Sequence, residues 1–315
     1  MMDWYAFYAA GTLLFKGAEP VDMGVDHNAS HIFPPPPQTI VGALRTAVLV
    51  QNGIPFENYY KKDVPFNILS VIGETGNPYP FQVSGPLFRI GEQIFVPAPF
   101  CWFMDKAEWK NETVQVLRAR VFRAQPTKSR LIKGEDETPF WVKEGRGEMF
   151  SLGGSWLKLE NLFSTEETLE IFKSNYFYAT EPRTGIALNR NRSVRQGHLY
   201  TFIHVRLKPD VALAFGTDVK LPLSNKGFLK LGAEQRFGRY EKIAEPFFPE
   251  NKTGHFLSLS QVKGSPKANQ SVIATGKIQY IGGWDLKKGF HKPMQGFFPA
   301  GSVFSENIHS NFVQI

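Results

Sequence analysis

HIFPPPPQTIVGALRTAVLV, residues 31–50, is the stretch that decides how the amino-terminal part of this chain folds. Its four consecutive prolines hold φ at about −65° and remove four backbone donors, so this backbone runs extended and cannot form a central strand. The residues behind them repeat at helical spacing and form an apolar stripe wide enough to lie on a sheet: Ile40, Val41, Leu44, Ala47 and Val48. We therefore expect a helix here, with Gln38 or Thr39 as its N-cap and Asn52-Gly53 at its end.

Gly42 and Arg45 lie off this stripe, near the first turns of the expected helix. The amino-terminal end of a helix is partly positive, so a backbone without a side chain and a nearby cation are suited to an anionic ligand. The alternative is a rigid entry loop followed by an ordinary core helix. These residues alone leave both interpretations open.

Residues 16–49 resemble the opening of the family of Cmr subunit three, part of the type III-B CRISPR effector and of the RAMP superfamily of CRISPR RNA-binding proteins. The resemblance is carried by Asp22, Ser30, PPPPQT (residues 34–39) and GALRT (residues 42–46). Three later groups match in the same order: RTGI (183–186) with LY (199–200); LGAEQR (231–236); and GWD (283–285) with KP (292–293) and PAGSV (299–303). The family usually has a second Gly and a second Arg where this chain has Ala233 and Gln235.

The resemblance implies an α+β fold of two ferredoxin-like, RRM-like RAMP modules with loop and hairpin insertions. It also implies a non-catalytic scaffold that binds the 5′ tag of the CRISPR RNA and needs no cofactor. The implied protein partners are the large polymerase-type subunit and the backbone RAMP subunits of the Cmr complex, and target RNA is contacted only indirectly. From the change of charge described below, we place the domain boundary near residue 178, giving domains 1–178 and 179–315.

Composition sets independent limits. The chain has 315 residues, of which 42% are hydrophobic, enough to bury two ordinary cores. Its single cysteine, Cys101, excludes an intramolecular disulfide and a cysteine-based zinc cluster. Asp22, Asp26 and His27 have no frame that favours a metal site, so we expect none. No apolar run reaches about eighteen residues and no signal peptide is evident, so we expect a cytoplasmic protein without a membrane contact.

Positive charge is concentrated in one segment. Residues 1–180 carry 17 Lys or Arg against 20 Asp or Glu, residues 181–240 carry 11 against 4, and residues 241–315 carry 8 against 5. A basic segment rich in Arg is typical of a protein that binds a phosphate backbone, although a solvated basic face is the alternative. The acidic amino-terminal part is left to face a protein partner or solvent.

The residues that we expect to contact RNA are polar, basic or glycine residues in these motifs and basic clusters: Lys16, Asn28, Ser30, Gln38, Thr39, Gly42, Arg45, Arg183, Arg190, Arg192, Arg195, Arg236, Arg239, Lys287, Lys288, His291 and Lys292. Phe237 or Tyr240, beside the loop at 231–236, is suited to stacking on a base, and the amides of that loop are suited to phosphate.

Other functions stay open. A metal-independent RAMP endoribonuclease would use His or Lys as acid and base, but no pair of histidines has a spacing that places both around one phosphate. The equivalent subunit of another type III subtype and a purely protein-binding module are the remaining alternatives.

Hydrophobic patterns predict several further elements. Residues 4–10 read as a first strand, and residues 186–194 and 198–207 as two strands joined by a basic loop. We expect an irregular insertion at 54–85, a helical segment at 165–172, and a strand at 272–280 that breaks at 282–284.

Overall fold

The computed structural model describes residues 2–17, 28–29, 31–109, 113–127, 140–142, 147–249, 254–285, 290–309 and 311–315. Antiparallel sheets dominate and helices are few, which makes this an α+β fold. The chain divides into two compact units, each built from three separate stretches. Several residues named above lie outside the described residues: Asp22, Asp26, His27, Ser30, Lys287 and Lys288.

Unit 1 comprises Met1–Gly91, Tyr178–Pro246 and Tyr280–Gly296. The strands of its main sheet are β1 (Asp3–Ala9), β3 (Val83–Ile90), β15 (Val211–Thr217), β16 (Lys226–Lys230) and β17 (Phe237–Ile243). They neighbour one another in the order β16-β17-β1-β15-β3, and these pairs are antiparallel. The first strand predicted from the sequence is therefore confirmed.

Helix α1 (Pro37–Gln51) contacts strands β3 and β16 of this sheet. Every residue of its predicted apolar stripe is buried, and Asn52 is the C-cap, so the helix and its end are confirmed. The predicted N-cap is wrong, because Pro36 holds that position without a side-chain hydrogen bond. Pro37 at the first helical position has its φ preset for the helix, and the N–H that it lacks would have no intrahelical partner, so the helix begins one residue before the predicted caps. At the other end, Gln51 Nε2 donates to the Tyr240 hydroxyl at 2.7 Å and ties the helix to β17.

Two short helices, α2 (Phe56–Tyr60) and α3 (Phe66–Ile72), follow α1. The expectation of an irregular insertion over 54–85 is thus wrong for its first part. Each helix has a proline as its N-cap, Pro55 before α2 and Pro65 before α3. Prolines in this segment start helices because their fixed φ suits the residue that enters a first turn.

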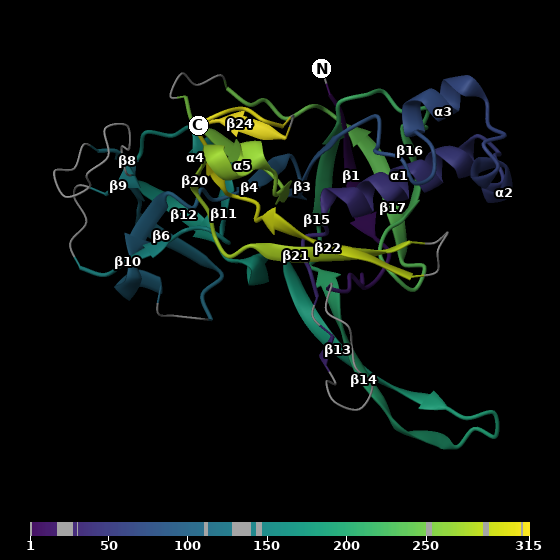
Figure 1. Ribbon diagram of the computed structural model, residues 1–315. Coiled ribbons are helices and arrows are strands. Elements are labelled where there is room, and N and C mark those ends of the chain that lie inside the picture. Colours follow the sequence, from purple (N-terminus) through teal and green to yellow (C-terminus); the bar gives the residue numbers. More distant parts are fainter. Residues whose placement is uncertain are drawn as a thin grey trace. The chain divides into compact units, whose positions relative to one another are not determined.

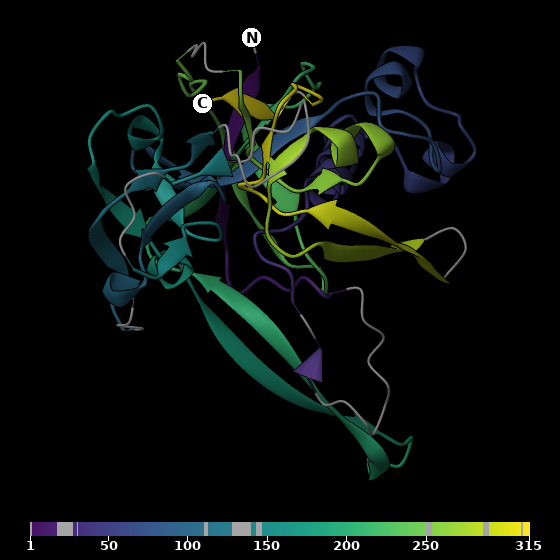
Figure 2. The ribbon, with the colours of Figure 1, turned by 60° about the vertical axis from the view of Figure 1, so that its left-hand side comes forward.

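A long hairpin, which we call the arm, extends from unit 1 beyond its main sheet (Figures 1 and 2). It consists of β13 (Tyr178–Leu188) and β14 (Val194–Leu207), and β2 (Asn28–Ala29) runs parallel to β14. At its base, the backbones of Leu13 and Val205 exchange hydrogen bonds of 2.8 and 2.9 Å. The predicted strand 198–207 lies within β14 and is confirmed, whereas the predicted strand 186–194 is wrong in its bounds, because β13 ends at Leu188 and the turn occupies 189–193.

Strands β21 (Gln279–Asp285) and β22 (Phe290–Phe298) neighbour each other near the end of the chain. The predicted strand at 272–280 is only partly right, because β20 covers Val272–Ala274 and β21 begins at Gln279. The predicted break at 282–284 is wrong, since β21 runs through these residues. Two glycines in a row weaken a strand, but a neighbouring strand supplies the hydrogen bonds that keep them extended.

Unit 2 comprises Glu92–Phe177, Phe247–Gln279 and Phe297–Ile315. Its larger group of strands has the order β4 (Gln93–Pro97), β11 (Trp156–Lys158), β12 (Thr168–Phe172) and β6 (Val116–Arg120). Strand β12 lies where we expected a helical segment, so that prediction is wrong. Leu169 and Ile171 alternate toward the core opposite Ala119 and Leu117 of β6, and this burial outweighs the helix signal of Glu166 and Glu167.

The remaining elements of unit 2 are short: β5 (Trp102–Asp105), β7 (Phe122–Arg123), β8 (Gln125–Pro126), β9 (Phe140–Trp141), β10 (Met149–Ser151), β18 (Phe256–Ser258), β19 (Val262–Lys263), β23 (Val303–Phe304), β24 (Phe312–Gln314), α4 (Leu159–Leu162), α5 (Pro266–Ser271), and the 3₁₀ turns Lys106–Trp109 and Ser174–Tyr176. One core cluster of this unit gathers Phe298, Phe304 and Phe312 around Ala268 of α5.

The two units alternate along the chain, so neither is one continuous segment. One of their borders lies between Phe177 and Tyr178, the position at which the charge of the sequence changes sign. The assignment of consecutive domains 1–178 and 179–315 stays a prediction. No helix among the described residues is long and apolar enough to span a bilayer.

Candidate nucleic-acid interface

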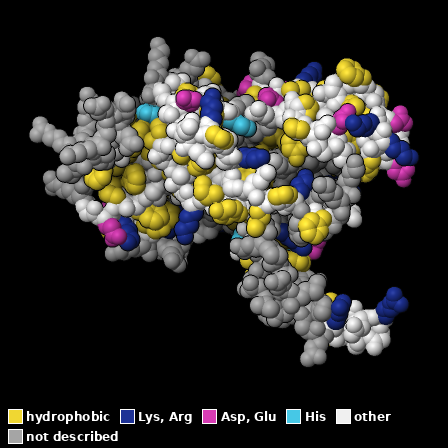
Figure 3. All heavy atoms as spheres, viewed as in Figure 1, with side chains coloured by type: hydrophobic (Ala, Val, Ile, Leu, Met, Phe, Trp, Pro, Cys, Tyr) yellow, Lys and Arg dark blue, Asp and Glu magenta, His cyan; other side chains and the backbone are white. Residues whose placement is uncertain are grey.

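The tip of the arm exposes three arginines. Arg190 and Arg192 lie in the turn between β13 and β14, Arg195 lies in the second residue of β14, and all three are exposed. The turn is held by the backbone bonds from Asn189 N to Ser193 O and from Arg192 N to Asn189 O, both 2.9 Å. Figure 3 shows dark blue basic side chains at this end of the arm. A turn fixed by its own backbone can present cations to a polyanion without first becoming ordered.

Apolar side chains accompany these arginines. Ile186, Leu188 and Val194 expose 46%, 54% and 60% of their surface beside the turn. About half or more of the surface of each of these side chains stays in contact with solvent when the chain is alone. The tip therefore offers a polyanion both cations and short apolar contacts.

An ion-pair cluster marks the base of the arm. Arg183 Nη2 donates to Glu181 Oε2 at 3.1 Å, and Arg206 donates through Nε and Nη2 to the same carboxylate from the paired strand. Hydrogen bonds from Arg206 and Arg183 lower the pKa of Glu181 to about 2. The cluster fixes the direction of Arg183, whose side chain still exposes 43% of its surface.

His204 links the arm to the loop at 231–236. The ring is buried, its Nδ1 lies 3.2 Å from Thr12 Oγ1, and its Nε2 lies 4.0 Å from Glu234 Oε2. Burial lowers the pKa of His204, and the charges of Arg183 and Arg236 lower it further. At neutral pH the imidazole is therefore uncharged and serves as a structural contact. No signal in the sequence separated this histidine from the other six.

The loop at 231–236 is held by backbone hydrogen bonds, both within the loop and to Leu14. Ala233 N donates to Leu14 O at 2.8 Å and Arg236 N donates to Ala233 O at 3.3 Å, so these two amides are already used and do not support the expected phosphate contact. Gly232 has a φ of +104°, and a Cβ there would lie 2.9 Å from Leu14 O, which explains why this position is glycine. Arg236 Nη2 donates to Glu234 Oε2 at 2.8 Å.

Lys16 and Asn28 come close to the arm. The Lys16 ammonium lies 4.0 Å from the centroid of the Phe202 ring, and Phe202 pairs with Arg183 across the hairpin. Asn28 of β2 pairs in register with Thr201. The structure thus brings Lys16, the backbone of Asn28 and Arg183 together at one level of the arm.

Arg45 has a different environment from the one predicted. Its Nη2 donates to the carbonyls of Gly73 at 3.3 Å and Glu74 at 2.9 Å, and its guanidinium lies 5.3 and 5.4 Å from the rings of Tyr59 and Tyr79. Burial lowers the pKa of Arg45. These contacts make Arg45 a brace between α1 and the segment after α3. Contact of Arg45 with RNA stays a prediction, and this geometry does not favour it.

Three further residues of α1 were predicted to contact RNA, and each has different surroundings from the others. Gly42 is exposed, and a Cβ on it would meet nothing within 4 Å. Thr39 N donates to Pro36 O at 2.9 Å. Gln38 Oε1 is buried and has no hydrogen-bond partner among the described residues, which leaves an acceptor available beside the start of α1.

Arg239 lies on the main sheet of unit 1. Its guanidinium lies 4.8 Å from the centroid of the Tyr8 ring, and Arg89 Nη1 donates to the Tyr8 hydroxyl at 2.8 Å. Of the two aromatic residues considered for stacking, Phe237 exposes 51% of its surface, whereas Tyr240 is buried against α1. The suggestion that Tyr240 stacks on a base is therefore wrong for this structure.

The carboxy-terminal basic cluster is described only in part. Lys287 and Lys288 are outside the described residues, as is the side chain of His291. Lys292, on β22, is exposed.

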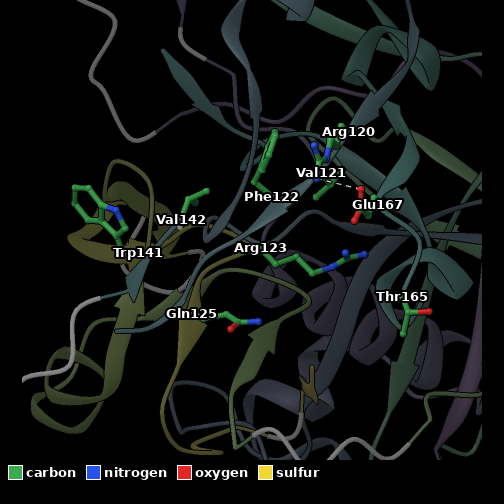
Figure 4. Close-up of a pocket in the computed structure, with 9 residues that line it drawn as sticks. All are labelled: Arg120, Val121, Phe122, Arg123, Gln125, Trp141, Val142, Thr165 and Glu167. Carbon is green, nitrogen blue, oxygen red and sulfur yellow. Dashed lines mark ion pairs between the residues drawn. The ribbon is translucent and has the colours of Figure 1, made fainter. Parts of the chain in front are cut away.

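Unit 2 contains a pocket that the sequence did not predict (Figure 4). Its volume is about 330 Å³, and its lining includes Arg120, Phe122, Arg123, Trp141 and Glu167. The two cations are engaged: Arg120 pairs with Glu167 at 3.1 Å, and Arg123 Nη2 donates to the carbonyls of Ser164 and Glu166 at 2.9 and 3.0 Å. The pocket is therefore less suited to an anion than its composition suggests.

Comparison with known proteins agrees with these features. The family model described as CRISPR-associated protein (Cas_Cmr3) matches residues 9–253. No curated protein matches the chain. One similar solved chain belongs to the type III-B Cmr-beta complex bound to cognate target RNA and AMPPnP, with a TM-score of 0.56, 14% identity, and coverage of 96% of this chain and 85% of that chain. Another, from Cmr-beta bound to cognate target RNA, has a TM-score of 0.55, 14% identity, and coverage of 96% and 86%.

At this identity the solved structures show a shared fold, and the family model carries the assignment. The matched segment contains α1, the arm and the loop at 231–236. This chain belongs to the CRISPR-associated Cas_Cmr3 family.

Proposed function

We propose that this protein is a non-catalytic RNA-binding scaffold of a type III-B CRISPR effector complex and that it binds the 5′ tag of the CRISPR RNA. In this proposal it also docks the large polymerase-type subunit and the backbone RAMP subunits, and it meets target RNA only indirectly. We further propose that its two compact units are two ferredoxin-like modules. The observation that carries the proposal is the arm, which exposes three arginines at its tip and has the ion pairs of Glu181 with Arg183 and Arg206 at its base.

The arm is suited to a single RNA strand for electrostatic reasons. Arg190, Arg192 and Arg195 are exposed cations within six positions, and their mutual repulsion is relieved when they bind phosphates. Arg183 is held by Glu181 at the other end of the arm, so its direction is set before RNA arrives. Phosphate contacts position an RNA, whereas its bases supply the specificity.

The surface of α2 and α3 is a candidate for the docking of protein subunits. Phe56, Tyr60 and Phe66 expose 44%, 49% and 84% of their surface on α2 and α3. They lie within the part of the chain that carries no excess of positive charge. Exposed aromatic side chains are enriched at protein contacts.

The environment of His204 supports a non-catalytic role. His204 is 2% exposed and its ring is engaged by Thr12, so it is poorly placed to exchange protons with a substrate. We expect purified protein to leave repeat-containing precursor RNA intact, with or without divalent metal ions. Discrete cleavage within the repeat would overturn the scaffold proposal.

The decisive experiment is recovery of bound RNA. The tagged full-length protein is purified from its native host, and the 5′ ends of the co-purified RNA are sequenced. One RNA class with a shared 5′ end of about eight nucleotides is the expected result. Recovery of protein partners without RNA would replace the proposal with a protein-binding scaffold.

A further inference from the structure

The outward face of the β16–β17 hairpin carries four exposed side chains in a square. Phe228 pairs in register with Arg239, and Lys230 pairs with Phe237. Directly paired residues of an antiparallel ladder project from the same face of the sheet, so all four share one face. The two phenylalanines occupy one diagonal of the square and the two cations occupy the other.

Exposure of these aromatic rings is high. Phe228 exposes 71% of its surface and Phe237 exposes 51%, with ring centroids 6.5 Å apart and an interplanar angle of 66°. The alternate residues Leu229 and Tyr240 are buried on the opposite face. Strand β16 is also the last strand in the order of this sheet. The two rings therefore lie outside the core, and they remain accessible to a ligand.

The charges around the square favour an anionic ligand. Lys230 and Arg239 are exposed, and Arg239 lies over the Tyr8 ring at 4.8 Å. Glu241, two residues after Arg239 on the same strand face, accepts a hydrogen bond from the Tyr8 hydroxyl at 3.2 Å and pairs with Lys226 at 3.8 Å. The acid is thus balanced by Lys226, and the square itself keeps a charge of +2.

We propose that this face binds an unpaired base of single-stranded RNA, which stacks on Phe228 and Phe237 while Lys230 and Arg239 bind the flanking phosphates. The inference rests on the proposed function, since it takes the chain to be an RNA-binding subunit. A flat sheet with exposed aromatic rings is a geometry that stacks bases, and stacking tolerates any base because every base has a π face. Exposed aromatic rings also occur at protein interfaces, but the two exposed cations between these rings favour a polyanion, because charged residues are depleted at the core of protein interfaces.

The test compares two short RNA oligonucleotides with the same phosphates, one with bases and one abasic, against the full-length protein. We expect the wild type to bind the base-containing oligonucleotide about 5- to 150-fold more tightly. The double variant Phe228→Ala/Phe237→Ala loses this preference and binds the abasic oligonucleotide as the wild type does. Phe237→Trp keeps the preference, as does the matched control Phe247→Ala, which removes an aromatic ring that is 81% exposed outside the sheet.

The outcomes separate this inference from the proposed function. A wild type that binds neither oligonucleotide overturns both. A wild type that binds both equally, or a double variant that is folded by circular dichroism and keeps the preference, overturns only this inference. If the double variant keeps its RNA affinity and loses a co-purifying protein subunit, the face is a protein contact and the inference is wrong.

Discussion

Arg45 shows how a cation near the start of a helix can serve packing. Its guanidinium donates to the carbonyls of Gly73 and Glu74, which follow the last turn of α3. Tyr59 adds a third contact by donating its hydroxyl to Gly73 O at 2.9 Å. Carbonyls at a helix end lack intrahelical partners, and Arg45 and Tyr59 supply donors to the carbonyl of the C-cap residue Gly73.

We predict that Arg45→Ala lowers the free energy of unfolding by about 1–3 kcal/mol, because charged donors to partly buried carbonyls are lost. Leu44→Ala should lower it by about 2–5 kcal/mol through a core cavity, since Leu44 is fully buried. Urea denaturation measures both, and RNA affinity of the folded Arg45→Ala protein should equal that of the wild type. A stable Arg45→Ala variant with weakened RNA binding would restore the ligand contact predicted from the sequence.

His204 predicts a dependence of stability on pH. Its pKa in the folded protein lies below the ordinary 6.5, through burial and then through Arg183 and Arg236, while Glu234 and Glu181 act in the opposite direction. As the pH falls below about 6.5, the unfolded chain takes up a proton that the folded chain resists, so stability falls. We expect the free energy of unfolding to decline over this range and His204→Gln to reduce the decline. An unchanged pH profile in the variant would mean that the imidazole protonates freely in the fold.

The surroundings of a side chain in the candidate interface could be predicted where they depend on the local sequence pattern. Arg190 and Arg192 could be placed on an exposed turn because two alternating strands flank them. Burial of His204 and Arg45 could not be foreseen, because it depends on Thr12 in the first case and on Gly73 in the second. Both partners lie far away in the sequence and meet these residues only through the tertiary fold.

At the level of elements, the arm combines three exposed arginines with a turn that is held by backbone hydrogen bonds. If Arg190, Arg192 and Arg195 bind phosphates, replacing all three with Ala should weaken binding to every RNA sequence. The slope of log affinity against log salt should become flatter by about 0.7 for each lost contact. Lys61→Ala, which removes a cation at the end of α2, is the control and should leave the slope unchanged. A triple variant with the wild-type slope would make the arm a solvated basic surface.

Helices and strands were predictable to different extents. The apolar stripe in α1 is a strong local pattern, and burial follows it. Strand β1 was predicted from its aromatic, β-prone residues, and four of them in a row are buried. The helices α2 and α3 were missed because prolines were taken as breakers, although Pro55 and Pro65 stand just before each helix. Strand β12 was missed because Glu166 and Glu167 gave a helix-start signal, while the alternation of Leu169 and Ile171 is short and gains its weight only through pairing with β6.

At the scale of the molecule, each unit is assembled from distant stretches. Strand β1 pairs on one side with β15 and on the other with β17, which lie in the second stretch of unit 1. Such pairings are set by the whole fold, so the sequence could suggest two cores but not which segments share one. The same topology leaves the arm outside the main sheet, attached through its base at Leu13 and Val205.

This separation predicts that the arm can be shortened without unfolding the protein. Residues 185–200 would be replaced by Asn-Gly, a two-residue turn that joins Thr184 to its register partner Thr201. The ion pairs of Glu181 and the bonds of Val205 remain, and residues 185–195 of the removed segment are half-buried or exposed, so the free energy of unfolding should change by less than about 1 kcal/mol.

RNA binding should respond differently from folding. The shortened protein loses Arg190, Arg192 and Arg195 together with the apolar tip, so it should co-purify with its protein subunits but retain less RNA than the wild type. The RNA recovered for each mole of protein, compared between the two at equal salt, measures this. Equal recovery from both proteins would mean that the tag is held at the base of the arm or on the main sheet, because the shortened chain keeps both.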